Sequence, residues 1–213
     1  MQKILIAVPT YENIYPDTFK SIYDLDGVGN ELSFESIRGY DVATARNKIV
    51  RKADELGVDY VLMVDNDVVI PGDALKNLLE DNERVCIGFY AHRGTDNLYH
   101  GNTNICRIYD TNGIAYFNYP LESEYTGKEL AEMKAEGRYK VQIHGGGLGC
   151  ALIRMDVFEI IKYPWFGWSH YKSGKMLSED LYFCERCKDK KIKIFTDTRV
   201  NCGHLMRHVQ FAD

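Results

Sequence analysis

Short apolar runs alternate with segments of helical periodicity over about the first 90 residues of the 213-residue chain. The apolar runs have the length of buried or half-buried strands: Ile4–Val8, Glu31–Ile37, Tyr60–Val64 and Val85–Tyr90. The segments between them space their apolar residues as a helix does: Pro16–Asp24, Ala43–Leu56 and Ala74–Leu79. Strands and helices in this order form right-handed crossovers with helices on both faces of a sheet. We therefore expect an α/β fold with a mainly parallel sheet.

The second half of the chain predicts shorter elements and one hairpin. Ile105–Tyr109 and Ile114–Asn118 flank an Asn-Gly turn at Asp110–Gly113, which is typical of a β-hairpin. The strands and helices expected after it are Glu129–Glu136, Val141–Ile143, Leu148–Ile153, Asp156–Ile161, Glu179–Lys188 and Ile192–Phe195, the last of which closes the sheet. We see no linker and no internal repeat, so a single domain over residues 1–213 is expected.

Composition excludes two classes of function. The formal net charge of −5 gives no basic footprint, so nucleic acid is an unlikely partner except as a modified acceptor. The sequence contains no apolar run near the roughly 18 residues that a membrane span needs. The N-terminal run Met1–Pro9 lacks the pattern of a signal peptide, so we expect a cytoplasmic protein.

Six cysteines raise the question of disulfides or a metal site. Without a secretory signal, we interpret them as reduced, mostly buried thiols. Cys184 and Cys187 form a Cys-x-x-Cys pair inside a helical pattern, with no second pair to complete a zinc site. We interpret this pair as two helix cysteines rather than a zinc or redox centre.

Two carboxylates follow the third predicted strand. Asp65 and Asp67 flank Asn66 directly after the apolar run Tyr60–Val64. Ligands of open α/β sheets bind at the carboxyl ends of the strands. Two acids separated by one residue supply the hard oxygen ligands that Mg²⁺ or Mn²⁺ shares with substrate phosphates. The alternative is a solvated acidic turn, since Asp-x-Asp alone is common.

The segment Met63–Pro71 resembles the Asp-x-Asp region of GT-A glycosyltransferases, particularly the family 2-like group of small bacterial and phage enzymes. Further segments that resemble this group follow in the expected order: Ala7–Tyr11, Ala45–Asn47, Gly145–Arg154 and Ser178–Asp180. The resemblance covers about residues 4–205. It implies a Rossmann-like GT-A domain, with a nucleotide-binding half at about 1–90 and a donor-sugar and acceptor half at about 91–213. It also implies transfer of a sugar from a nucleotide-sugar donor, with UDP favoured.

The resemblance also implies a metal site. Asp67 is expected to be the principal ligand of Mn²⁺ (or Mg²⁺), with Asp65 nearer the ribose or reaching the metal through water. His204 stands where related enzymes carry a histidine that completes the site. Imidazole together with carboxylates favours Mn²⁺. The alternative for His204 is a purely structural histidine.

Glu179 and Asp180 are the candidate catalytic acids. An inverting transferase uses a carboxylate to take the proton of the acceptor hydroxyl. Both residues open a predicted helix, where the helix dipole favours anions, but acids in the first turn are also ordinary helix caps. We prefer Asp180 as the base, and a retaining mechanism would need none.

Several residues are expected to hold the donor. Pro9, Thr10 and Tyr11 follow the first strand, where a ring can stack on a base. Arg46 either contacts the diphosphate or base, or is a solvated helix residue. The remaining donor residues are Asp65, Asn66, the close-approach glycines Gly146 and Gly147, and Arg207 on a C-terminal lid.

The aromatic residues of 165–171 form either an acceptor platform or part of the core: Trp165, Phe166, Trp168, His170 and Tyr171. Two rival functions remain open. Asp65 and Asp67 also fit the aspartate pair of haloacid-dehalogenase phosphatases, although that pair normally follows the first strand. A non-catalytic nucleotide-sugar-binding module of the same fold is the second rival. The sequence identifies neither the sugar, the acceptor nor the oligomeric state.

Overall fold

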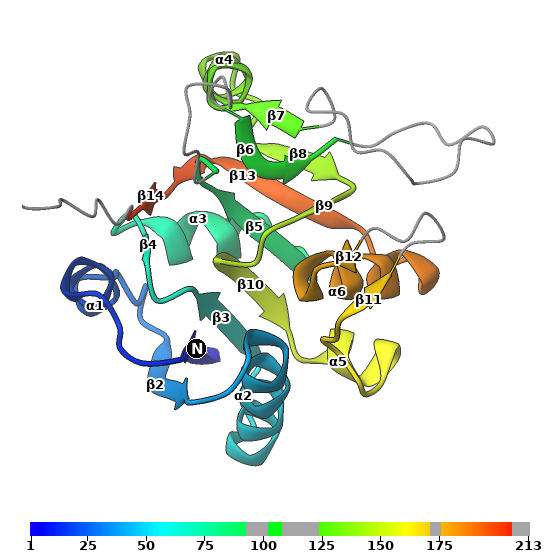
Figure 1. Cartoon of the computed structure of the whole chain (residues 1–213). Helices are drawn as coiled ribbons and strands as arrows, with labels where there is room; N and C mark the ends of the chain where they lie inside the picture. The colour runs from blue at the N-terminus through cyan, green and yellow to red at the C-terminus, as the bar shows by residue number, and fades with distance from the viewer. Residues whose placement is uncertain (93–101, 108–123, 171–175, 206–213) are drawn as a thin grey trace, which may run out of the picture.

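The computed structural model describes residues 1–92, 102–107, 124–170 and 176–205, and its centre is a seven-stranded sheet (Figure 1). In sheet order the strands are β2 (Glu31–Arg38), β1 (Lys3–Thr10), β3 (Tyr60–Val64), β10 (Cys150–Arg154), β5 (Val85–Phe89), β13 (Ile194–Asn201) and β8 (Lys140–Ile143). β2, β1, β3, β5 and β13 run in one direction, while β10 and β8 run in the other. The expected mixed, mainly parallel α/β sheet is therefore confirmed.

Two strands of the second half make the sheet differ from the one expected. β10 is inserted antiparallel between β3 and β5, so the four strands of the first half do not form an uninterrupted parallel sheet. β13 extends to Asn201 rather than ending at Phe195, and it does not close the sheet, because β8 pairs along its outer side. Apolar periodicity identified both strands, but it carries no information on which neighbour a strand pairs with.

Helices cover both faces of the sheet, as predicted. They are α1 (Pro16–Tyr23), α2 (Val42–Leu56), α3 (Ala74–Glu80), α4 (Gly127–Ala135), α5 (Asp156–Ile161) and α6 (Glu179–Asp189). Alternate residues of β1 show the two layers: Leu5 joins a core with α2, α5 and α6, while Ile6 joins a core with α1 and α3. Residues of a strand point alternately to its two faces, so one strand serves both layers.

Short pairings outside the main sheet connect distant segments. β14 (Gly203–His204) pairs antiparallel with β4 (Val68–Val69). β6 (Asn102–Cys106) pairs with β7 (Glu124–Thr126) and with β9 (Gly145–Gly146), while β11 (Ser169–His170) pairs with β12 (Met176–Leu177). The predicted hairpin turn at Asp110–Gly113 and its second strand lie outside the described residues. Within the described part of the chain, none of the helices is long and apolar enough to cross a membrane.

The cysteines are where their sequence context predicts. All six are free and buried. Cys184 and Cys187 lie on the core side of α6, where burial raises the pKa of both thiols, that of Cys187 to about 12. Their interpretation as apolar helix residues is confirmed.

Candidate active site

A cavity of about 490 Å³ opens where β1 and β3 end. β1 and β3 are parallel neighbours, with Ile4 opposite Tyr60 and Ala7 opposite Met63, so their carboxyl ends lie at the same edge of the sheet. The predicted site residues in the cavity wall are Pro9, Thr10, Tyr11, Asp65, Asn66, Asp67, Glu179 and His204. Four further wall residues were not predicted: Tyr40, Asp41, Val42 and Tyr90. The volume is in the range of small-molecule sites.

His204 lies beside Asp67 because β14 pairs with β4. His204 is opposite Val68 in the register, and the backbone N–H of Leu205 donates to the Asp67 carbonyl at 2.9 Å. His204 Nδ1 is 2.8 Å from the carbonyl oxygen of Ala91 and therefore carries the proton as its donor. In the neutral ring this leaves the lone pair on Nε2, which is 3.8 Å from Asp67 Oδ1.

This pair fits one end of a metal site. A distance of 3.8 Å is too long for a hydrogen bond but shorter than two metal–ligand bonds of about 2.1 Å each. A ligating histidine typically donates its other ring N–H to a carbonyl, as His204 does. In the described residues no group of three or more His, Cys, Asp or Glu side chains is arranged around a common centre. Further ligands would have to come from phosphate and water.

Asp65 does not form a three-residue cluster with that pair in the described part of the chain, and it is bonded to Arg46. Asp65 Oδ1 accepts a hydrogen bond from Arg46 Nη2 at 2.8 Å. Arg46 Nη1 forms ion pairs with Asp180 and, at 3.2 Å, with Glu179. The Arg46 side chain is fully buried, in the first turns of α2. One guanidinium thus joins three carboxylates from two elements at the floor of the cavity.

Arg46 is therefore buried and is absent from the cavity wall. This position matches neither of the two interpretations made from the sequence, a donor contact or a solvated helix residue. Burial by itself would lower the pKa of Arg46, but the carboxylates of Asp65 and Glu179 raise it. The guanidinium therefore stays charged. A single positive charge faces three acids, so the floor carries surplus negative charge.

The two candidate bases differ in position. Glu179 lines the cavity, whereas Asp180 is absent from its wall. Both open α6, which Ser178 caps by accepting from the Leu181 N–H. Burial raises the pKa of Glu179, although the Arg46 charge opposes the shift. A raised pKa brings a carboxylate closer to the range of a general base.

The glycine-rich segment packs against protein rather than lining the cavity. A Cβ on Gly146 would lie 2.7 Å from the Asn104 carbonyl oxygen, and one on Gly147 would lie 2.5 Å from the Tyr90 hydroxyl. A Cβ on Gly149 would meet both Tyr90 Oη at 2.8 Å and Asp65 Oδ2 at 2.9 Å. The glycines therefore let Tyr90 and Asp65 approach the sheet, and burial raises the pKa of the Tyr90 hydroxyl.

Asn66 ties down the loop after β1. Its Nδ2 donates to Thr10 Oγ1 at 3.2 Å and to the Asn13 carbonyl at 2.8 Å, and its own carbonyl accepts from the Tyr15 N–H. Tyr11, on this loop, is 72% exposed and stands at the mouth of the cavity. Asn66 thus orders the wall on which Tyr11 stands.

Asp41 and Tyr40 form the neighbouring part of the wall. Asp41 caps α2 by accepting from the Thr44 N–H at 3.1 Å, and a hydrogen bond with the Thr44 side chain is the main reason for its lowered pKa. The indole of Trp168 donates to the same oxygen at 3.3 Å. An N-cap pattern before α2 was the available signal for Asp41. Tyr90 ends β5 as Asp65 ends β3, which was the signal for Tyr90.

The predicted aromatic platform divides between core and surface. Phe166 is buried and stacks on Phe183, and Trp165 packs against Phe158. Trp168 is 49% exposed. Tyr171 and the predicted lid residue Arg207 lie outside the described residues.

Comparison with known proteins supports the fold. No protein-family model and no curated protein matches the sequence. The structure is similar to that of A197 from STIV, with a TM-score of 0.61 and 17% identity, over 96% of this chain and 86% of that one. It is also similar to GalNAc-T7, crystallised with UDP, GalNAc and Mn²⁺, with a TM-score of 0.60 and 11% identity. The likeness covers 97% of this chain but 44% of GalNAc-T7. The chain therefore has the GT-A type of α/β fold.

Proposed function

We propose that this chain is a metal-dependent glycosyltransferase that moves a sugar from a nucleoside-diphosphate donor, with a UDP-sugar favoured, to a hydroxyl of a glycan, protein or other acceptor. The observation that carries the proposal is the orientation of His204 toward Asp67. Its Nδ1 bonds the Ala91 carbonyl, and its Nε2 is 3.8 Å from Asp67 Oδ1. A histidine held in this tautomer beside a carboxylate is suited to Mn²⁺ more than to Mg²⁺.

Asp67 and His204 would hold the metal, together with donor phosphates and water. When bound, the metal neutralises charge that develops on the departing diphosphate. The surplus negative charge around Arg46 raises the attraction of the cavity floor for a cation. GalNAc-T7, which shares the fold, was crystallised with UDP and Mn²⁺, and this is consistent with the proposal.

We assign the general base to Glu179 in preference to Asp180. Both acids contact Arg46, but Glu179 lines the cavity and has a raised pKa, while Asp180 is absent from the cavity wall. In an inverting transfer Glu179 would accept the proton of the acceptor hydroxyl as the new glycosidic bond forms. Arg46 would act as a positioning residue for both acids.

The donor base would bind where Tyr11, Tyr40 and Asp41 come together. The two rings offer stacking surfaces. The Asp41 carboxylate can accept an imino N–H, which uracil and guanine have and which cytosine and adenine lack. These residues support UDP or GDP as the carrier, and residues 1–90 as the nucleotide-binding half of a single domain.

The rival functions make different demands on Asp65. An aspartate-nucleophile phosphatase needs a free carboxylate after its first strand, but Asp65 follows β3 and is bonded to Arg46. A binding module without catalysis is the alternative that an experiment must distinguish from a transferase.

Incubation of the protein with a panel of UDP- and GDP-sugars and Mn²⁺ should release nucleoside diphosphate slowly by donor hydrolysis. Tight donor binding with no release in Mn²⁺, for the wild type and for every donor, would favour the binding module.

A further inference from the structure

A second hollow, of about 650 Å³, lies beside the edge strand β8 and shares no residue with the candidate active site. It is formed by the end of α3, the segment that leads into β8, and β13. Its wall consists of Glu80, Asp81, Gly137, Arg138, Tyr139, Lys140, Val141, Gln142 and Arg199. Nothing in the proposed transfer reaction uses these residues.

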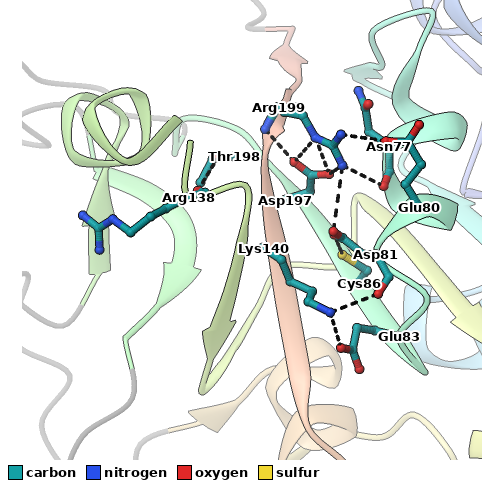
Figure 2. Close-up of polar contacts among 10 residues, drawn as sticks. All are labelled: Asn77, Glu80, Asp81, Glu83, Cys86, Arg138, Lys140, Asp197, Thr198 and Arg199. Atoms are coloured by element: carbon teal, nitrogen blue, oxygen red, sulfur yellow. Dashed lines mark hydrogen bonds and ion pairs between the residues drawn. The ribbon is translucent and has the colours of Figure 1, made fainter. Parts of the chain in front are cut away.

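Arg199 belongs to the wall of this hollow and makes several polar contacts, which Figure 2 shows. Its Nε and Nη2 donate to Asp197, which is fully buried, and its Nη1 donates to Glu80 Oε2 at 2.7 Å. Its Nη2 also donates to the Asn77 carbonyl at 3.2 Å. The hydrogen bond with Asp197 is the main cause that raises the pKa of Arg199. The guanidinium therefore stays charged and immobile.

The other cations of the wall are paired as well. Lys140 donates to Glu83 Oε1 at 2.7 Å, and Arg138 pairs with Glu136 at 2.8 Å. Asp81, another carboxylate of the wall, lies 3.9 Å from Arg199 Nη2. Carboxylate, ammonium and guanidinium groups that are already paired keep further acceptor and donor sites. These sites suit a neutral ligand rich in hydroxyl groups.

Tyr139 supplies an apolar surface beside these polar groups. Its side chain is 44% exposed, and the Arg199 guanidinium lies 4.9 Å from the ring centroid, which fixes the ring. An immobilised ring next to convergent hydrogen-bonding groups matches the two sides of a sugar ring, one of C–H groups and one of hydroxyls. We propose that this hollow is an auxiliary binding site for a neutral saccharide unit.

The site would hold a glycan at a place separate from the cavity where transfer is proposed. Its existence does not depend on the transferase activity, since its residues and its ligand are distinct. With one stacking ring and exposed hydrogen bonds, the dissociation constant should be on the order of 1 mM.

The test is a titration of the ¹⁵N-labelled chain with glucose, galactose, mannose, N-acetylglucosamine and their β-linked disaccharides, followed by amide chemical shifts. At least one neutral sugar should shift the amides of 137–142 and of Glu80 and Asp81. Tyr139→Ala should weaken that binding at least tenfold, while Tyr139→Phe should keep it. Tyr23→Ala, which removes an exposed ring on α1, is the matched control and should change nothing.

Three outcomes would overturn the proposal. The first is that the amide chemical shifts of 137–142 stay unchanged with every sugar of the panel up to 50 mM, which is roughly fifty times the expected dissociation constant. Equal affinity in Tyr139→Ala is the second. Tighter binding of inorganic phosphate or glucuronic acid than of neutral sugars is the third, because the proposed ligand is neutral. UDP binding in Mn²⁺, measured on the same variants, reports separately on the transferase proposal and should be unaffected by Tyr139.

Discussion

Two arginines of this molecule are each surrounded by carboxylates, but they are held in opposite ways. Arg199 bonds Asp197 through two nitrogens and also reaches Glu80 and a backbone carbonyl. Arg46 is more deeply buried, yet within the described residues its Nε lacks a hydrogen-bond partner, and it meets three different acids through its two terminal nitrogens. All three guanidinium nitrogens of Arg199 donate hydrogen bonds, whereas Arg46 is shared among three acids and leaves its Nε without a bond in the described part of the chain.

The difference separates a structural clamp from a prepared site. Around Arg199 three carboxylates also gather, but Asp197 and Glu80 accept hydrogen bonds from it, and the Arg199 and Glu80 side chains are partly exposed to solvent. This network joins β13 to the end of α3 (Figure 2). Around Arg46 two of the three negative charges are uncompensated, which is costly in a buried place unless a cation or a proton compensates them. Such surplus charge is a feature of functional sites rather than of stable cores. We expect the two clusters to respond differently to substitution.

The largest effect should be on transfer rate, and it concerns the two acids that Arg46 holds. Glu179→Gln should lower donor turnover about 10²–10⁴-fold, since a general base is removed. Asp180→Asn should lower it less, because that carboxylate does not line the cavity. Donor hydrolysis at saturating Mn²⁺ measures both. A larger loss of turnover in Asp180→Asn than in Glu179→Gln would identify Asp180 as the general base.

The next effect is on folding. Arg46→Met leaves three acids at the cavity floor without their cation and should lower the free energy of unfolding by about 3–5 kcal/mol. Arg51→Met, on the exposed side of the same helix, should change it by less than about 0.5 kcal/mol. Urea denaturation at pH 7 gives both values. Equal stability of the two variants would mean that the Arg46 cluster has no structural role.

A smaller effect is expected on the metal. His204→Ala removes one proposed ligand and should weaken Mn²⁺ binding in the presence of UDP about 10–100-fold, a loss comparable to that on removing a supporting residue of a metal site. Affinity in the wild type should also fall at acid pH, because a ligating imidazole must be neutral. Calorimetry over pH 5.5–8 follows both changes. Unaltered Mn²⁺ affinity in the variant would leave His204 as a structural residue.

The smallest effect tests the surplus charge itself. Burial raises the pKa of Glu179 in the folded chain, so its ionisation begins to cost stability above the unfolded-state pKa, and the full cost is present above the folded-state pKa. In chelator, Glu179→Gln should therefore be more stable than the wild type at pH 7. The gain should shrink as the pH falls through the folded-state pKa and vanish near pH 4. Asp197→Asn should destabilise instead, because Asp197 is paired with Arg199.

The sequence predicted the site better where it depends on strand order than where it depends on side-chain direction. Asp65 and Asp67 follow an apolar strand, and parallel strands end at one edge, so their place beside Thr10 could be inferred. His204 was assigned to the metal site with Asp67 from the resemblance to GT-A enzymes. The burial of Arg46 could not be inferred, because helical periodicity does not reveal that an arginine faces acids from α6.

The same limit explains why the sheet positions of β10 and β13, and the hollow beside β8, were not predicted from the sequence. The sequence of β10 predicts an apolar strand but not its neighbours, and only packing decides that it lies between β3 and β5. Tyr139 and Arg199 are about sixty positions apart and belong to segments with no common motif. Local pattern therefore predicts elements and their ends, whereas contacts between distant side chains follow from the whole fold.

Calorimetry of UDP binding tests the central claim most directly. Wild-type protein should bind UDP in Mn²⁺ and should lose most of that affinity in chelator. Asp67→Ala should bind UDP weakly in both conditions while keeping its melting temperature, and Asp54→Ala, which removes an exposed acid of α2, should behave as the wild type. Equal UDP affinity with and without Mn²⁺, or in Asp67→Ala and the wild type, would contradict a metal-dependent donor site at Asp67 and His204.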